Sequence, residues 1–516
     1  MIKRLTSILI MALFISSFHI GYAEDTKTTA SYFKSIEMGE ELDFLRALQI
    51  VKDEDLAVDA AKTMTRAEFA KLACRAINQE ETALKANYTQ IYSDVSTSHK
   101  AFSQIVHMSN LGYFNGNANG SFEPDREVSM NEAVKIAVTL LGYHNIMDKS
   151  QGYPGAYLSI AGAKGLLKNV LTSGKATRRV DIYMLMYNMV NSDIVKITGY
   201  GAEYSYEIQK DHSILTEYWE LMKGTGIVLA DNFISIDGEK TIPQGSINID
   251  GELYNSATPQ TADKVGRKTE FYYKADENLN LKTIYYIKTK IANVVTLTAD
   301  LIDSFDYNSG IYTIFENGKE KKFSVGNKYL LSYNGDAVVG SDIVKMNPRC
   351  GTVTLIDNDN NSTYDVVIVE EYYNLVVDRY DKSSNIIYDK FGKHIVLDDY
   401  THIRAEFDLL KLQENNIISV FIGSESVKMQ LSTDKAAGTV DEISTSDNEM
   451  FITVSGQDYK KSLDLNKDIT TVRTGGEYTF FIDYFGDIAY FELGTEMDYG
   501  YILQFSEYKN ALKQRE

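Results

Sequence analysis

The chain has 516 residues, more than a single hydrophobic core ordinarily organises, so two to four domains are expected. Acidic residues outnumber basic ones by 72 to 52, which gives a formal net charge of −20. A surface of this sign repels the phosphates of nucleic acid and argues against that class of partner. It suits a protein that stays soluble outside a cell or that binds cations.

The first 23 residues have the order of a secretory signal peptide. Lys3 and Arg4 precede an apolar run of roughly a dozen residues, and the small residues of Gly21-Tyr22-Ala23 then supply a cleavage site. The run is short for a bilayer span, and no later segment has about 18 consecutive apolar residues. We therefore expect a secreted protein with no membrane span; a retained anchor is the alternative.

Residues 36–191 carry apolar side chains at helical spacing, and two helix starts in this region share one sequence form. Residues 65–68 (TRAE) and 129–132 (SMNE) both read Ser/Thr-x-x-Glu before an apolar stripe. This is the pattern of a capping box, in which the first side chain accepts from the fourth backbone N–H and the fourth side chain reaches back. Helix capping alone would explain both segments.

Repetition suggests more than capping, because the helical region divides into three units of similar plan. The units span residues 36–78, 91–142 and 152–191. Each contains a helix, a loop and a second helix with an acidic residue in its first turn. Tandem units of this length indicate a repeat architecture in which neighbouring units complete one core.

The stretches SDVSTSHKAFSQIVHMSNLGYFNG, GSFEPD and MTRAEFAKL resemble S-layer homology (SLH) repeats. The third unit, with GYPGAYLSIAGAKGLL, is similar to the variant found in clostridial surface proteins. The resemblance implies a three-pronged helical spindle that binds, without covalent linkage, a secondary cell-wall polysaccharide attached to peptidoglycan. It also implies a location at the cell wall or in the surface layer.

The resemblance further implies which residues bind the polysaccharide. The family's TRAE arginine faces an anionic sugar, and it matches Arg66 in the first unit and Arg179 in the third. A guanidinium suits this role because it offers paired donors to a carboxylate. The second unit has Met130 at the same place and has lost the cation. The other matched positions are Glu68, Asp94, Asp181 and Tyr153. The alternative is a spindle kept as a scaffold without a ligand.

Residues 192–223 are expected to form a helical connector, with one helix around SILTEYWELM, which contains the only Trp. From residue 224 onward, short runs rich in Val, Ile, Tyr and Phe alternate with Asp, Asn and Gly clusters, a pattern typical of strands and turns. The predicted fold class is therefore multidomain α + β, a helical three-repeat spindle followed by tandem antiparallel barrels or sandwiches.

The β-rich part also contains repeats. INIDGELY and ITVSGQDY share the form I-x-[I/V]-x-G-x-x-Y, and a Gly-x-Val step precedes each. Gly351-Thr352-Val353 offers a third such step. We expect a β module over residues 224–298, a β-rich middle region over 299–430 and a second module over 437–516, the last of them cut short.

One loop in the middle region has the spacing of a metal site. LIDNDNNSTYDVVIV places Asp357, Asp359, Asn361 and Asp365 at positions 1, 3, 5 and 9 between two strands. Oxygen ligands at this alternation can converge on Ca²⁺, as in the first part of an EF-hand loop. Ser362 stands where that loop has Gly, and no Glu follows at position 12. Ca²⁺ is a candidate cofactor, and a polar hairpin turn is the alternative.

The sequence carries no nucleophile elbow, zinc-protease, Walker or dinucleotide-binding motif. Cys74 and Cys350 are too few for a disulfide scaffold, and we expect them to be buried free thiols. The preferred interpretation is a non-catalytic surface protein, held on wall polysaccharide by its repeats, with the β modules displayed outward. The alternative is a wall-anchored glycan hydrolase or processing enzyme with its site in the β region. Self-assembly into a lattice is a further candidate property.

Overall fold

The computed structural model describes residues 38–172, 177–200, 204–238, 242–256, 264–316, 318–338, 343–446 and 449–494. The chain forms two compact units: residues 1–228 with 245–291, and residues 229–244 with 292–516. The predicted signal peptide and the end of the predicted last module lie outside the described residues. Within those ranges, no helix combines the length and the hydropathy that crossing a membrane requires.

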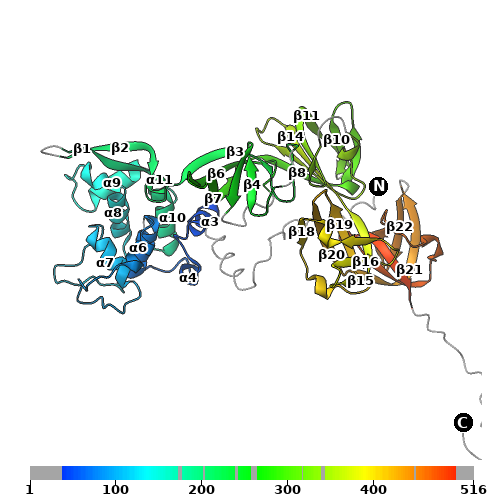
Figure 1. The fold of residues 1–516 in the computed structure, drawn as a ribbon, viewed down its shortest axis with the longest axis horizontal. Helices are drawn as coiled ribbons and strands as arrows, with labels where there is room; N and C mark the ends of the chain where they lie inside the picture. The colour runs from blue at the N-terminus through cyan, green and yellow to red at the C-terminus, as the bar shows by residue number, and fades with distance from the viewer. Residues whose placement is uncertain are drawn as a thin grey trace, which may run out of the picture. The chain divides into compact units, whose positions relative to one another are not determined.

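The front of the first unit is helical, as the sequence predicts (Figure 1). α5 packs against α7, α8 packs against α9, and α10 contacts α3, α5 and α8. Fully buried aromatic side chains, among them Phe44, Phe69 and Phe122, fill the space between the helices. The helices are α3 (Glu40–Ala47), α4 (Asp53–Leu56), α5 (Arg66–Ala76), α6 (Glu80–Lys85), α7 (Phe102–Asn110), α8 (Met130–Leu140), α9 (Gly155–Ala163) and α10 (Arg179–Val190).

Both predicted capping boxes are confirmed. At the start of α5, the Glu68 N–H donates to Thr65 Oγ1 at 3.2 Å and the Thr65 N–H donates to Glu68 Oε2 at 2.8 Å. At the start of α8, the same reciprocal pair joins Ser129 and Glu132, at 3.3 and 2.9 Å. The boxes satisfy backbone N–H groups that have no partner within the helix and so fix where each helix begins.

The expected helical connector is wrong in most of its length. β1 (Asp193–Tyr200) and β2 (Tyr204–Ser213) form an antiparallel hairpin, and only α11 (Ile214–Glu217) is helical. The helix stops early because Glu220, three residues after it, adopts a left-handed backbone with φ 55°, and the chain turns into the next strand. Trp219 therefore lies after the helix.

The first β module closes as a five-stranded barrel in the order β3-β4-β5-β7-β6. INIDGELY supplies the hairpin between the second and third strands, and a parallel contact between β5 and β7 completes the closure. The strands are β3 (Met222–Ala230), β4 (Ser246–Ile249), β5 (Glu252–Ser256), β6 (Lys268–Asp276) and β7 (Leu281–Thr289).

Three further sheets follow in the second unit. The first is seven-stranded: β8 (Asn293–Thr298), β9 (Ile302–Asp306), β10 (Ile311–Glu316), β11 (Lys319–Tyr333), β12 (Asp336–Ala337), β13 (Gly351–Asp357) and β14 (Thr363–Glu371). The next is six-stranded: β15 (Tyr373–Asp381), β16 (Ile386–Asp389), β17 (His394–Val396), β18 (His402–Ala405), β19 (Ile417–Ile422) and β20 (Ser426–Ser432). The last is five-stranded: β21 (Lys435–Ser446), β22 (Glu449–Val454), β23 (Gln457–Lys460), β24 (Glu477–Ile482) and β25 (Ile488–Leu493).

All four modules share one strand plan. In the last module, β21 pairs both with the following hairpin strand β22 and with β24. β15 pairs with β16 and β19 in the same way. In the seven-stranded sheet two strands share these pairings, since β9 pairs with the hairpin strand β10 and β8 pairs with β13. A parallel contact recurs in each module: β5–β7, β11–β14, β18–β20 and the Lys461–Ile488 bridge.

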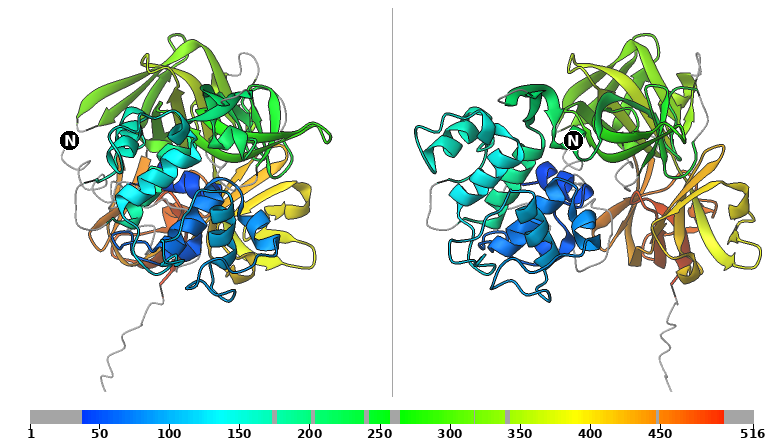
Figure 2. Two further views of the ribbon diagram at one scale, coloured as in Figure 1. Left: turned by 90° about the vertical axis from the view of Figure 1, so that its left-hand side faces the viewer. Right: turned by 60° about the vertical axis from the view of Figure 1, so that its left-hand side comes forward.

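The shared plan changes the interpretation of the middle region. The region holds two modules, each with its own buried cluster, one around Val353 and Val367 and the other around Leu375 and Ile418. Gly351-Thr352-Val353 begins β13 and is not a module's first strand, unlike the Gly-x-Val steps in β3 and β21. The six-stranded and five-stranded sheets lie side by side, yellow beside orange in both views of Figure 2.

Candidate functional site

Arg66, the first residue of α5, is only 9% exposed. Its Nε donates to the Phe122 carbonyl oxygen at 2.9 Å, one terminal nitrogen to Glu132 Oε1 at 3.1 Å and the other to the Asn115 carbonyl oxygen at 3.3 Å. The guanidinium carbon also lies 4.6 Å from the centroid of the Phe122 ring. Arg66 therefore ties the first repeat to the loop and the cap of the second.

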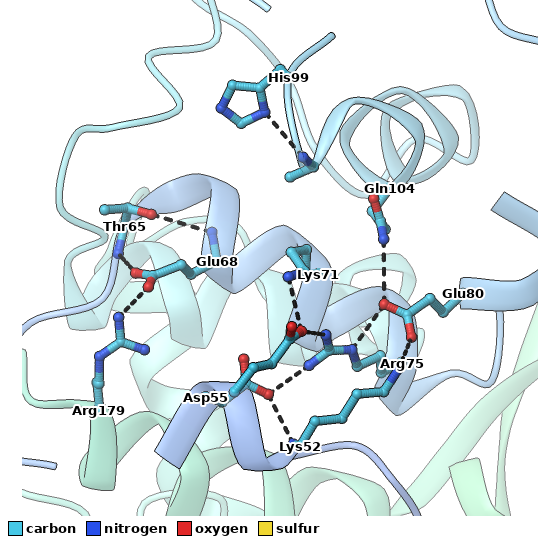
Figure 3. A network of polar contacts seen from close by, with 12 residues as sticks. Lys52, Asp55, Thr65, Glu68, Lys71, Arg75, Glu80, His99, Gln104 and Arg179 are labelled. Atoms are coloured by element: carbon cyan, nitrogen blue, oxygen red, sulfur yellow. Dashed lines mark hydrogen bonds and ion pairs between the residues drawn. The ribbon is translucent and has the colours of Figure 1, made fainter. Parts of the chain in front are cut away.

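Arg179 does the same between the third repeat and the first. It is the first residue of α10, is 3% exposed and forms an ion pair with Glu68, the acidic member of the first capping box (Figure 3). Its Nε has no hydrogen-bond partner among the described residues. Both arginines that the sequence singles out are thus buried and are paired with an acid of another repeat.

The third ion pair that this pattern implies is absent from the described residues, because Met130 occupies the first position of α8 and is buried. Asp181 is the acid that would pair with the missing cation. Instead, its two carboxylate oxygens accept hydrogen bonds from the guanidinium of Arg178, in its own repeat, at 2.7 and 2.9 Å. It also accepts the Leu171 backbone N–H at 3.0 Å. Asp181 is 3% exposed, so it is engaged inside the fold.

Backbone contacts accompany these inter-repeat ion pairs. The Arg179 N–H donates to the Lys62 carbonyl at 2.8 Å, and the Arg66 N–H donates to the Arg126 carbonyl at 2.9 Å. The backbone N–H of the next residue along each helix, Val180 or Ala67, also donates to a carbonyl oxygen of the neighbouring repeat. First-turn N–H groups, which no helix can satisfy internally, are thus used to join one repeat to the next.

The carboxylates of the site are held in the ionised form. Burial raises the pKa of Glu132, but hydrogen bonds from Arg126 and Ser129 outweigh it and lower the pKa to about 2. The pKa of Glu68 is lowered in the same way by Arg179 and the Thr65 N–H, against the effect of burial. Asp94 accepts the backbone N–H groups of Phe122 and Glu123, each at 2.7 Å, and these lower its pKa against desolvation.

Tyr153, by contrast, is 55% exposed. Lys135 Nζ lies 5.7 Å from the centroid of its ring, and the Tyr157 ring packs edge-on against it at 6.2 Å. Burial and the nearby charge of Glu132 raise the pKa of the Tyr153 phenol, and the charge of Arg126 lowers it. The Arg126 side chain is 43% exposed. We call Arg126, Lys135 and Tyr153 the cationic-aromatic surface.

Sequence reasoning missed Arg126 and Lys135. Arg126 stands three residues before the cap residue Ser129, and Lys135 lies one turn inside α8, so both belong to the repeat that lacks the TRAE arginine and stand on either side of its capping box. The signal that could have found them is their position, one cation on each side of the place where Met130 replaces the arginine, although the surrounding acids Glu123, Asp125, Glu127 and Glu132 outnumber them.

The predicted calcium loop joins β13 to β14. Ligand atoms of Asp357, Asp359 and Asp365 lie within 4.8 Å of one another. Asn361 is turned into the loop, where its side-chain amide donates to Asp359 Oδ2 at 2.9 Å and its Oδ1 accepts the Thr363 N–H at 2.7 Å. Three of the four predicted ligands are therefore close enough to share a cation.

The same contacts also support the alternative of a polar turn. Asp357 is fully buried and accepts the backbone N–H groups of Asn361 at 3.2 Å and Ser362 at 2.9 Å. Asp483 holds the corresponding β24–β25 turn of the last module by accepting the N–H groups of Phe485 and Asp487, both at 2.9 Å. A buried Asp after the strand is thus a turn device that this chain uses more than once.

The fold and the site define a class of protein, a helical repeat domain followed by a series of β modules. No family model matches the chain. It is 29% identical to the middle cell wall protein of Brevibacillus brevis over 42% of this chain and 20% of that protein. It is 24% identical to a surface layer protein of Brevibacillus choshinensis, over 96% of this chain and 51% of that protein. A cell surface protein of Thermoanaerobacter kivui is 23% identical over 90% of this chain and 57% of its own length.

The chain is thus distantly related to surface layer, cell surface and cell wall proteins, and the relation extends over most of its length. These relatives agree with a location at the cell surface. The chain spans at most a little over half the length of the curated relatives that it matches.

Proposed function

We propose that this protein is a non-catalytic component of the cell surface that holds an anionic secondary cell-wall polysaccharide through its helical repeats. The observation that carries the proposal is the cationic-aromatic surface, because Lys135 lies beside an exposed tyrosine, and Arg126, although paired with Glu123 and Glu132, keeps 43% of its side chain exposed. Cations of this kind bind carboxylates of a sugar polymer, and an aromatic ring covers the apolar face of a sugar.

In this proposal Arg66 and Arg179 position the repeats and do not contact the polymer. Their burial and their ion pairs with Glu132 and Glu68 support that role. Asp94 and Asp181 serve in the same way, through the loop N–H groups that they accept. Tyr153 is the member of the sequence-predicted set that we assign to the ligand.

The test is co-sedimentation of the mature chain with cell-wall sacculi, before and after the secondary polysaccharide is removed. We expect binding that is lost on removal, that weakens with salt and that falls in Lys135→Met and Tyr153→Ala. Arg379→Met is the matched control, because Arg379 is an exposed arginine 4.0 Å from the Tyr388 ring centroid in the β region. Equal sedimentation with intact and stripped walls would contradict the proposal.

The absence of catalysis is tested separately. Incubation of the full chain with sacculi and with the released polysaccharide should liberate no reducing ends over the background of a heat-denatured sample. Steady release of reducing ends would favour the hydrolase alternative and direct attention to the β modules.

A further inference from the structure

A cavity of about 270 Å³ lies in the first unit, where the first helical repeat, the connector and the barrel strand β7 meet. Its lining includes Gln49, Arg75, Asn78, Glu80, Trp219 and Tyr285. The cationic-aromatic surface contributes no residue to it. The volume is slightly below the roughly 300–1,000 Å³ of ordinary small-molecule sites, which suits a single small ligand.

The two aromatic side chains of the cavity are held in place. Trp219 Nε1 donates to the Ala76 carbonyl oxygen at 2.9 Å, which fixes the indole against the end of α5. Tyr285 lies on β7, and both rings pack against the main hydrophobic core while remaining partly exposed. A ligand that binds here therefore does not have to order these two aromatic side chains, which lowers the entropic cost of binding.

The polar wall of the cavity is also preorganised, and its charges are internally paired. Arg75 is 3% exposed and donates to Glu80 at 2.9 Å, Asp55 at 2.6 Å and Glu54 at 2.7 Å. Lys52 Nζ donates to the other oxygen of Glu80 at 2.6 Å (Figure 3). Because these cations already have carboxylate partners, the wall offers hydrogen-bonding groups without a free charge that would select an anion.

The amides at the rim complete the set. Asn78 Nδ2 donates to the Tyr218 carbonyl at 3.0 Å and Gln49 Nε2 to the Arg46 carbonyl at 3.0 Å, so both amides are oriented. Both residues are exposed at the surface. Their amides can exchange hydrogen bonds with a ligand's hydroxyl groups.

We propose that this cavity binds a neutral saccharide unit. Such a ligand has an apolar C–H face for Trp219 and Tyr285 and hydroxyl groups for the amides and carboxylates of the wall. Charge pairing within the wall and the net charge of −20 on the chain both disfavour an anionic ligand. The site is separate from the proposed polymer-binding surface and does not depend on it.

Trp219 is the only Trp in the sequence, so the intrinsic Trp fluorescence of the chain comes from a residue that lines this cavity. We would titrate the mature chain with N-acetylglucosamine and with its β-1,4-linked disaccharide while following Trp fluorescence, and confirm binding by calorimetry. We expect a saturable change. Tyr285→Leu should weaken binding about tenfold, the loss of one aromatic contact worth about 1.4 kcal/mol.

The control is Tyr307→Leu, which removes a 47% exposed tyrosine of the second unit and should leave the affinity unchanged. Gln49→Glu at the exposed rim should also weaken binding, which keeps the test decisive if Tyr285→Leu folds poorly. Absence of any saturable change or heat would overturn the proposal. So would an unchanged affinity in both cavity variants, or binding of adenosine, an uncharged aromatic probe, without binding of the sugars. Sedimentation with cell walls is a separate readout, so failure of one proposal leaves the other standing.

Discussion

Replacing Arg66 by Met should destabilise the helical domain strongly, although no surface contact changes. The substitution removes three hydrogen bonds from a side chain that is 9% exposed and leaves the carbonyl oxygens of Phe122 and Asn115 without their donor. Removing one partner of a buried ion pair costs about 3–5 kcal/mol. The lower end applies here, because Glu132 is partly exposed and keeps Arg126 as a partner.

A loss of about 3 kcal/mol should lower the melting temperature of a domain of this size by about 6–12 °C. Differential scanning calorimetry of the full chain measures it, provided the transition of the helical domain is resolved. Arg126→Met is the matched control, since Arg126 contacts the same Glu132 but is 43% exposed, and it should cost less than about 1 kcal/mol. Equal shifts in the two variants would refute the reasoning that burial, and not the ion pair alone, sets the cost.

Three further outcomes are expected. Burial and the neighbouring Asp483 raise the pKa of Asp487 to about 8, so the folded state holds this proton more tightly than the unfolded state. The stability of the last module should therefore fall as pH rises from about 4 to about 8, and Asp487→Asn should flatten a plot of melting temperature against pH. Calcium titration should show one site that Asp359→Asn and Asp365→Asn both abolish; no heat in the parent chain would leave the loop as a turn. Cys74 is buried, as expected, whereas Cys350 is only half-buried. Cys74 should resist a thiol reagent until the chain unfolds, because burial raises the pKa of its thiol to about 12; reaction of Cys74 in the folded protein would contradict this, and Cys350 should react slowly, because desolvation also raises the pKa of its thiol.

Sequence periodicity was sufficient for the helical front, because its helix starts are encoded locally. Thr65, Glu68, Ser129 and Glu132 form their capping boxes from residues three apart, a distance that pattern reasoning covers. The prediction of a helical connector was wrong because the DIVKITGY and YSYEIQKDHS runs pair with each other as a hairpin, and only four residues of the SILTEYWELM stretch beside them form a helix.

The candidate site was harder to predict for a physical reason. Whether an arginine meets a ligand or an acid of its own chain depends on contacts between residues far apart in sequence. Arg66 and Glu132 are 66 positions apart, and Arg179 and Glu68 are 111 apart. The four-module plan of the β region was hidden for a similar reason, since the parallel contacts that close each module join strands that are not neighbours in sequence.

The two halves of the chain differ in how freely they could change in number. Two of the three helical repeats, the first and the third, give an arginine to the acid of a neighbouring repeat, and the first repeat takes part in both ion pairs. Its deletion would therefore leave Arg179 and Glu132 each without the partner that it supplies. Three of the β modules, in contrast, each bury a cluster of their own. Evolution could lengthen or shorten the β series one module at a time, while loss of the first helical repeat would break both of the ion pairs that join the repeats.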